Sequence, residues 1–220
     1  MGKNEMLKDY MEYRCGVYFW LKNLYLKEPS IEILKEISTT CKEYARLAEF
    51  NKEEQGFINF FKSLEEEEVH VLHDAIKPEY ARLFIGPRRV PVPPYESVYR
   101  ENRKSIFGRH TMAVREVYQN AGIELGAGLN IPEDFIGFEL EFMYYLSFET
   151  VKAIEADEWD KVSKLLSYQQ YFLSHHLVKW INEFTQDIVK ETTLEYFEIK
   201  AKFTAEFIVN DHESLSELIA

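Results

Sequence analysis

Apolar residues recur every three or four positions through most of the chain, which is the spacing of one face of a helix. The first pattern covers residues 5–27 and ends before Pro29, since a proline disfavours helical backbone in the residue before it. Ser30 is the expected N-cap of a second helix, and Asn51 with Glu54 forms a capping box for a third. Three helices are therefore expected in the first third of the chain.

An acidic run at 65–68 marks the start of the next helix, because negative charge is favoured at a helix N-terminus. Pro78 is expected to restart a helix, since proline suits the first helical turn. The later patterns predict a helix over 105–121 that Gly122 ends, followed by a long buried helix over 134–156. Asp157 is expected to cap the next helix, which continues or restarts to residue 184. A capping box of Thr192 and Glu195 is expected to start the last helix.

No segment alternates between apolar and polar residues in the manner of a strand bounded by turns. The pattern therefore predicts an all-α fold of about nine to eleven helices. With 220 residues, of which 46% are hydrophobic, the chain is long enough to bury a sizeable core. We expect one globular helical domain over residues 1–220.

The stretch 80–99, which reads YARLFIGPRRVPVPPYESVY, combines aromatic residues with prolines. Tyr80, Leu83 and Phe84 share one face of a helical turn that Gly86 then ends. The prolines that follow stiffen an extended loop, and Tyr95 and Tyr99 stand about one turn apart after it. Two interpretations stay open, namely core helices joined by a stiff connection, or an apolar shelf with free carbonyls for an incoming peptide.

Several motifs between residues 80 and 185 resemble the TorD/DmsD/NarJ-type redox-enzyme maturation chaperones. They are Tyr80-x-x-Leu83-Phe84-Ile85-Gly86-Pro87, Pro93-Pro94-Tyr95-Glu96-Ser97-Val98-Tyr99, Ile106-Phe107-Gly108, the run PEDFIGFELE at 132–141 and the run FLSHHLVKWINEF at 172–184. The resemblance implies a cytoplasmic protein without catalytic activity that binds precursors of molybdopterin oxidoreductases, often at their twin-arginine signal peptides.

The resemblance also implies the position of the peptide-binding site. It maps onto Tyr80, Leu83, Phe84, Pro87, Tyr95, Gly108, Asp134 and Phe135. Members of the family commonly have Asp-His where this chain has Asp134 and Phe135. Phe135 has no imidazole and therefore supplies neither the hydrogen bond nor the pH response that a histidine would give.

The residues themselves offer two components that a signal peptide needs, an aromatic platform and carboxylates that can hold an arginine fork. The platform consists of Tyr80, Leu83, Phe84, Tyr95 and Tyr99, and the acidic residues are Glu96, Asp134, Glu139 and Glu141. Each has a structural alternative: Tyr80 and Phe84 as core residues, Asp134 as a helix cap, and Glu139 as a buried carboxylate that ties down a loop. Arg88 and Arg89 would repel a cationic ligand unless they face away or pair with the glutamates, so we interpret them as solvated loop charges.

The formal net charge of −12 and the pI near 5.1 argue against a nucleic-acid partner, whose phosphates require clustered Lys and Arg. A cationic peptide would be attracted, although acidity also serves simply to keep a protein dispersed. The sequence has no run of membrane-spanning length and no secretory signal, which favours a cytoplasmic protein without stable membrane insertion.

Cys15 and Cys41 form no CxxC pair and are interpreted as small buried apolar residues in a reducing compartment. His70 and His73 lack further ligands at a metal-binding spacing, and no nucleotide loop or catalytic motif is recognisable. We therefore expect no metal, no cofactor and no enzymatic activity. The alternatives are a NarJ-like assembly factor for a reductase that is not exported, and a helical protein that binds a small molecule or nucleotide. Either a monomer or a homodimer fits the sequence.

Overall fold

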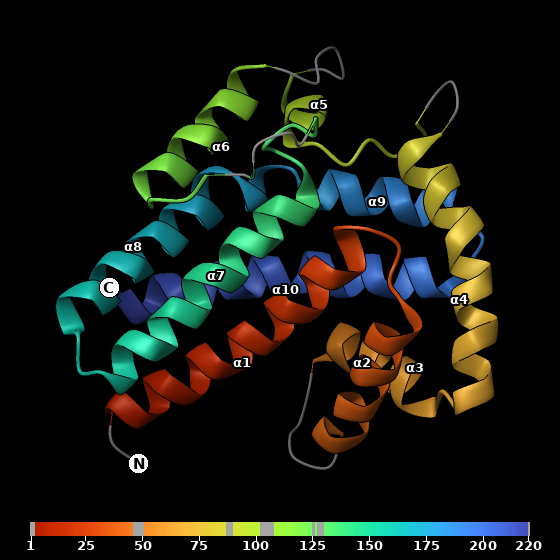
Figure 1. The fold of residues 1–220 in the computed structure, drawn as a ribbon, viewed down its shortest axis with the longest axis horizontal. Coiled ribbons are helices and arrows are strands. Elements are labelled where there is room, and N and C mark those ends of the chain that lie inside the picture. The colour runs from red at the N-terminus through yellow and green to blue at the C-terminus, as the bar shows by residue number, and fades with distance from the viewer. Residues whose placement is uncertain are drawn as a thin grey trace. The chain divides into compact units, whose positions relative to one another are not determined.

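The computed structural model describes residues 3–45, 51–86, 90–101, 108–124, 126 and 130–219, without the side chain of Lys3. Within these ranges the chain forms ten α-helices and no strand, apart from an isolated antiparallel bridge between Tyr95 and Phe135 (Figure 1). This confirms the all-α prediction and the expected number of helices.

The helices are α1 (Lys3–Tyr25), α2 (Ile31–Tyr44), α3 (Lys52–Ser63), α4 (Glu66–Tyr80), α5 (Glu96–Arg100), α6 (Arg109–Asn120), α7 (Ile136–Glu155), α8 (Trp159–His175), α9 (Ile181–Glu191) and α10 (Glu195–Ile219). A π-turn, η1 (Ala81–Ile85), extends α4, and a short 3₁₀ turn, η2 (Leu177–Lys179), separates α8 from α9.

The two predicted N-terminal caps are present. The Ser30 hydroxyl accepts a hydrogen bond from the Ile33 amide at the start of α2. Asn51 and Glu54 exchange the two hydrogen bonds of a capping box at the start of α3. Local sequence therefore sets where these two helices begin.

Three expected helix boundaries are wrong. Pro78 lies inside α4 and starts no new helix. Asp157 does not cap α8, because its backbone is left-handed with φ 55° and Glu158 occupies the N-cap position. Thr192 accepts a hydrogen bond from the Leu194 amide, and α10 begins only at Glu195, so the expected capping box is not formed.

Other boundaries agree or lie outside the described residues. Gly122 follows α6 with φ 78°, a conformation that glycine adopts at little cost, and so ends that helix as predicted. The expected helix start at 105 lies outside the described residues. The last helix, α10, continues from Glu195 to Ile219.

The described chain separates into two compact units, each assembled from distant segments. Unit 1 consists of Met1–Lys22, Tyr95–Trp180 and Asn210–Ala220, and unit 2 consists of Asn23–Pro94 and Ile181–Val209. The expectation of a single domain stays a prediction.

In unit 1, α7 runs between α1 and α8 (Figure 1). The rings of Phe19 and Tyr144 join α1 to α7, with their centroids 5.7 Å apart. Phe142 packs edge-on against Phe172 of α8, with centroids 4.9 Å apart. The long apolar helix predicted at 134–156 is thus the central helix of this unit.

Unit 2 has an aromatic core between α3, α9 and α10. Phe57 stacks on Phe203 with centroids 4.3 Å apart. The Tyr25 ring lies 5.8 Å from that of Phe184. Cys41 is buried there as expected, and burial raises the pKa of its thiol to about 12. Cys15, in unit 1, is partly exposed, which contradicts its expected burial.

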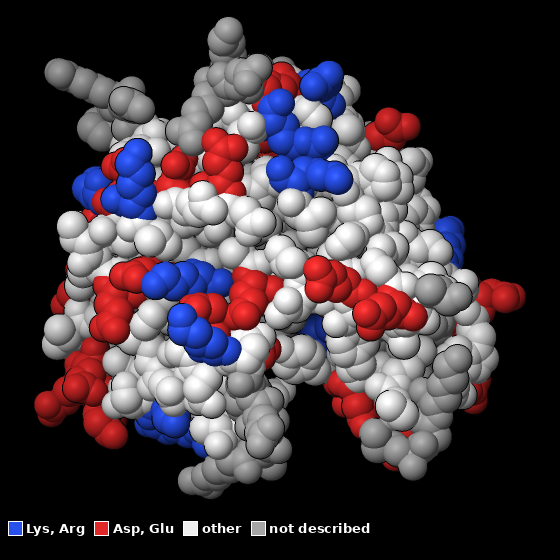
Figure 2. Space-filling view, turned by 180° about the vertical axis from the view of Figure 1, so that it is seen from behind, with Lys and Arg blue, Asp and Glu red and all other residues white. Residues whose placement is uncertain are grey.

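None of the helices in the described ranges is both long enough and apolar enough to cross a bilayer. The face drawn in Figure 2 carries acidic and basic side chains close together.

Candidate functional site

The helical turn that carries the first family motif is closed by backbone hydrogen bonds. The amide of Gly86 donates to the carbonyl of Ala81, five residues earlier, at 2.8 Å. A separation of five residues, instead of the four of an α-helix, defines a π-turn. Gly86 has φ 45° and therefore ends the helix, as predicted. The Val92 amide returns to the Leu83 carbonyl at 3.0 Å, so this carbonyl already has a backbone partner.

The side chains of this turn are packed inside unit 2. Leu83 is fully buried, and Tyr80 and Phe84 are 7% and 8% exposed. The Tyr80 hydroxyl donates to the carbonyl of Tyr25 at 3.0 Å, and Phe84 contacts the rings of Phe184 and others of the core. Of the two interpretations left open for this turn, the burial of Tyr80 and Phe84 agrees with core residues, since core rings cover the face that an open shelf would present.

Lys200 is the charged side chain next to this turn that sequence analysis missed. It is fully buried, and its ammonium lies 4.0 Å from the Tyr25 ring centroid and 5.3 Å from that of Phe84. Its Nζ donates to the Leu24 carbonyl at 3.2 Å. Burial lowers the pKa of Lys200 well below its usual range. Nothing in the apolar pattern of α10 distinguishes this lysine from its exposed neighbours.

The second family motif forms the start of α5 in unit 1, against the loop that precedes α7. Asp134 is fully buried, and its carboxylate accepts hydrogen bonds from the Ser97 amide at 2.8 Å and the Thr111 hydroxyl at 2.9 Å. Burial raises the pKa of Asp134, although these hydrogen bonds oppose the rise. Asp134 does not cap its own helix, since Phe135 occupies the N-cap of α7. Its carboxylate instead holds α5 through the Ser97 amide and α6 through the Thr111 hydroxyl.

Glu96 lies at the centre of a buried polar group. One oxygen contacts His176 Nδ1 at 2.8 Å, and the other accepts from the Arg100 guanidinium. Glu96 is fully buried and His176 is almost fully buried, so the contact between the two side chains is shielded from water. No motif in the sequence shows that His176 meets Glu96, 80 positions away.

Glu139 on α7 completes this group. It is fully buried, and Trp180 donates to one of its oxygens at 3.2 Å. Burial is the main cause that raises the pKa of Glu139 well above its usual range, and the nearby carboxylates of Glu96 and Asp134 raise it further. Both causes favour the protonated form of this carboxyl group over the ionised one. This agrees with the predicted structural role of Glu139.

The remaining predicted residues vary in accessibility. Tyr95 is half-buried against Phe135, and Tyr99 is buried against Trp180 with ring centroids 5.5 Å apart. A Cβ atom at Gly108 would come within 2.2 Å of the Glu101 carboxylate, so a larger residue there would require the Glu101 side chain to move. Pro87, Arg88 and Arg89 lie outside the described residues.

The structure thus brings the predicted residues together in two groups. Unit 1 holds Tyr95, Glu96, Tyr99, Gly108, Asp134, Phe135 and Glu139, and unit 2 holds Tyr80, Leu83 and Phe84. The first group is mainly a buried hydrogen-bonded network with aromatic packing around it. Glu141, the fourth predicted carboxylate, is partly exposed and pairs with Lys22 at 3.2 Å.

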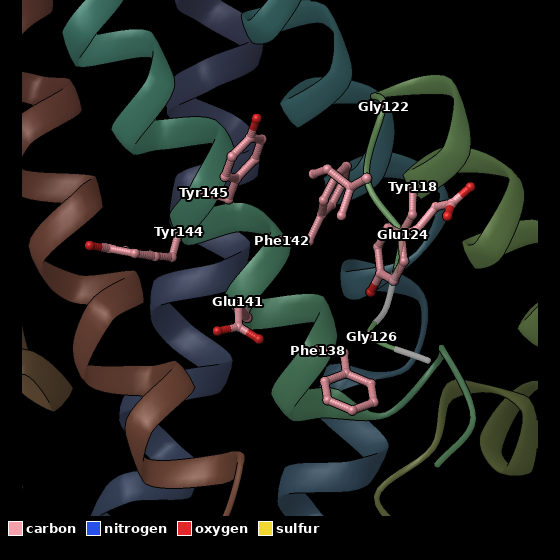
Figure 3. Close-up of a pocket in the computed structure, with 10 residues that line it drawn as sticks. Tyr118, Gly122, Glu124, Gly126, Phe138, Glu141, Phe142, Tyr144 and Tyr145 are labelled. Atoms are coloured by element: carbon pink, nitrogen blue, oxygen red, sulfur yellow. The ribbon is translucent and has the colours of Figure 1, made fainter. Parts of the chain in front are cut away.

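A pocket of about 570 Å³ opens beside α7, formed largely by residues that sequence analysis did not select as site residues (Figure 3). It is lined by Tyr118, Gly122, Ile123, Glu124, Gly126, Phe138, Glu141, Phe142, Tyr144 and Tyr145. In Figure 3 the side chain of Phe142 points from α7 toward the segment that follows α6. The aromatic positions of α7 and the glycines that follow α6 gave no signal specific enough to separate this pocket from the core.

No group of three or more His, Cys, Asp or Glu side chains in the described ranges is arranged to hold a metal ion. The carboxylates of Glu96 and Asp134 have protein partners at both oxygens. Only one oxygen of Glu139 has a hydrogen-bond partner among the described residues, the Trp180 indole.

Comparison with known proteins agrees with the resemblance. The chain is 26% identical over 218 residues to the chaperone protein TorD of Vibrio cholerae, covering 97% of this chain and 96% of that protein. It is 29% identical over 133 residues to the probable Tat proofreading chaperone DmsD of Haemophilus influenzae, covering 60% of this chain and 58% of that protein. With the Tat proofreading chaperone DmsD of Salmonella typhimurium it shares 30% identity over 111 residues, which cover 50% of this chain and 48% of that protein.

The relatives are named as chaperones, which confirms the expectation of a chaperone rather than an enzyme. The family model described as nitrate reductase delta subunit matches residues 41–186, which is more than half of the chain. The protein therefore belongs to the nitrate reductase delta subunit family and is a maturation chaperone of the TorD and DmsD type.

Proposed function

We propose that this protein is a cytoplasmic chaperone that binds the signal peptide of a molybdopterin-containing oxidoreductase, and its apo-form, until the cofactor is inserted and the enzyme is exported. The observation that carries the proposal is the match to TorD along 97% of the chain. The net charge of −12 supports it, because a twin-arginine peptide is cationic and is attracted by an acidic protein.

The predicted site residues remain candidates for peptide contact. The effect expected of a variant depends on whether the residue that it replaces is accessible or buried. Tyr95 and Gly108 are partly accessible, whereas Glu96, Asp134 and Glu139 are fully buried. A buried side chain touches a peptide only after the packing around it opens. Substitutions of the buried residues are therefore expected to affect the stability of the protein more than its affinity for the peptide.

The proposal is tested by producing an identified molybdopterin oxidoreductase from the same organism with and without this chain. We expect the enzyme to co-purify with the chain before cofactor insertion, and to contain less cofactor when the chain is absent. Equal cofactor content under both conditions, together with no co-purification, would overturn the proposal.

A second candidate function is assembly of a reductase that is not exported; the name of the matching family supports a reductase as the client. The two candidates differ in the segment of the client that is bound. Removing the N-terminal signal segment of the client should abolish co-purification under the first proposal and leave it unchanged under the second.

A further inference from the structure

Two adjoining cavities in unit 1 together offer an apolar and an acidic compartment. The larger, of about 570 Å³, is the pocket beside α7. The smaller, of about 340 Å³, is lined by Arg115, Tyr118, Gln119, Ile123, Glu124 and Glu133. Tyr118, Ile123 and Glu124 line both cavities, so the two compartments meet at these residues.

The larger compartment can accept an apolar side chain. Phe138, Phe142 and Tyr145 of α7 contribute aromatic surface to it (Figure 3). Tyr145 is 40% exposed, and Phe148, one turn further along α7, is 43% exposed. Exposed aromatic rings beside an apolar pocket are typical of peptide-binding surfaces.

The smaller compartment can accept a cation. Glu133 uses Oε1 to hold the Arg115 guanidinium at 2.6 Å, and its Oε2 is buried with no hydrogen-bond partner among the described residues. Glu124 is exposed and forms no ion pair with a described residue. An unmatched carboxylate oxygen and an exposed carboxylate therefore line the compartment that adjoins the apolar one.

We propose that the paired cavities bind a cationic apolar segment of the client's signal peptide, with one apolar side chain beside α7 and an adjoining arginine at Glu124 and Glu133. This rests on the proposed function and specifies where the peptide binds. An arginine fork matches two carboxylate oxygens better than a lysine does, because its donors are fixed in one plane.

The test uses fluorescence anisotropy of a labelled synthetic peptide that has two consecutive arginines followed by six leucine and alanine residues. The full-length protein is compared with Tyr145→Ser and Glu124→Lys variants, both at exposed positions. We expect each variant to bind at least tenfold more weakly. Tyr171→Ser and Glu213→Lys are the matched controls, since both residues are exposed and line neither cavity, and these should bind within twofold of the original protein.

A charge exchange tests the assignment of Glu124 independently of folding. A second peptide with two glutamates in place of the arginines should bind the Glu124→Lys variant more tightly than it binds the original protein. Equal affinity of all variants for the arginine peptide would overturn the location of the site and leave the proposed function standing. Failure of the arginine peptide to bind the original protein would overturn the inference as well, whereas the proposed function is judged separately by co-purification of the client.

Discussion

Arg14 on α1 and Asp211 on α10 are 197 residues apart in the chain and form a buried ion pair in unit 1. Arg14 Nη2 donates to Asp211 Oδ2 at 2.8 Å, and a second bond joins Nε to Oδ1. The Tyr18 hydroxyl also donates to Oδ2, at 2.6 Å. Because both charges are excluded from water, each depends on the other for its stability.

Replacing Asp211 with alanine should therefore destabilise the protein strongly. The substitution leaves the buried Arg14 without its carboxylate, and we expect a loss of roughly 3–5 kcal/mol in the free energy of unfolding. Urea denaturation followed by circular dichroism measures it. The double variant Arg14→Met with Asp211→Leu is the control, and it should be markedly more stable than Asp211→Ala. An equal loss in the two proteins would show that the unpaired charge is not the cause.

The helices were predictable because their signals are local. Ser30, Asn51 and Gly122 each act on backbone groups within a few residues, so their roles can be read from a short stretch of sequence. Pro78 was misread because a proline marks a first helical turn only on average. Here the helix continues past it, and no local rule decides between the two outcomes.

The site was predictable only in part, because burial depends on contacts between distant segments. The aromatic residues Tyr80 and Phe84 share a helix face, as expected, but the core of unit 2 covers that face. The pairing of Glu96 with His176 joins residues 80 positions apart, and the sequence contains no motif that specifies it. Lys200 was missed for the same reason, since its surroundings come from several helices.

Tyr80→Phe should cost stability without removing the ring from the core. The substitution deletes the hydrogen bond from the hydroxyl to the Tyr25 carbonyl, and such a bond contributes about 1 kcal/mol. For a chain of this size this corresponds to a melting temperature lower by about 2–4 °C. Differential scanning calorimetry measures the shift. Tyr171→Phe, at an exposed position, is the control and should leave the melting temperature unchanged.

Lys200→Met should stabilise the protein, most of all at low pH. Burial lowers the pKa of Lys200, so the folded state gives up a proton that the unfolded state keeps up to a pKa near 10.5. Stability of the original protein therefore rises with pH between the lowered pKa and about 10.5, and methionine at this position removes that rise. Melting temperatures at pH 6 and pH 9.5 test this, with exposed Lys202→Met as the control. A constant difference between variant and original at both pH values would contradict the lowered pKa.

Glu139→Gln should stabilise the protein with the opposite dependence on pH. The pKa of Glu139 is raised above its ordinary value of 4.5, so the folded state holds a proton that the unfolded state releases. The stability of the original protein is therefore highest below about pH 4.5 and falls as the pH rises through the raised pKa. Glutamine keeps the shape and can still accept from Trp180, but it does not ionise. The gain in melting temperature should accordingly be larger at pH 8 than at pH 5, whereas Glu141→Gln, which removes a partly exposed carboxylate, should show no such increase. A gain that is the same at both pH values would contradict the raised pKa of Glu139.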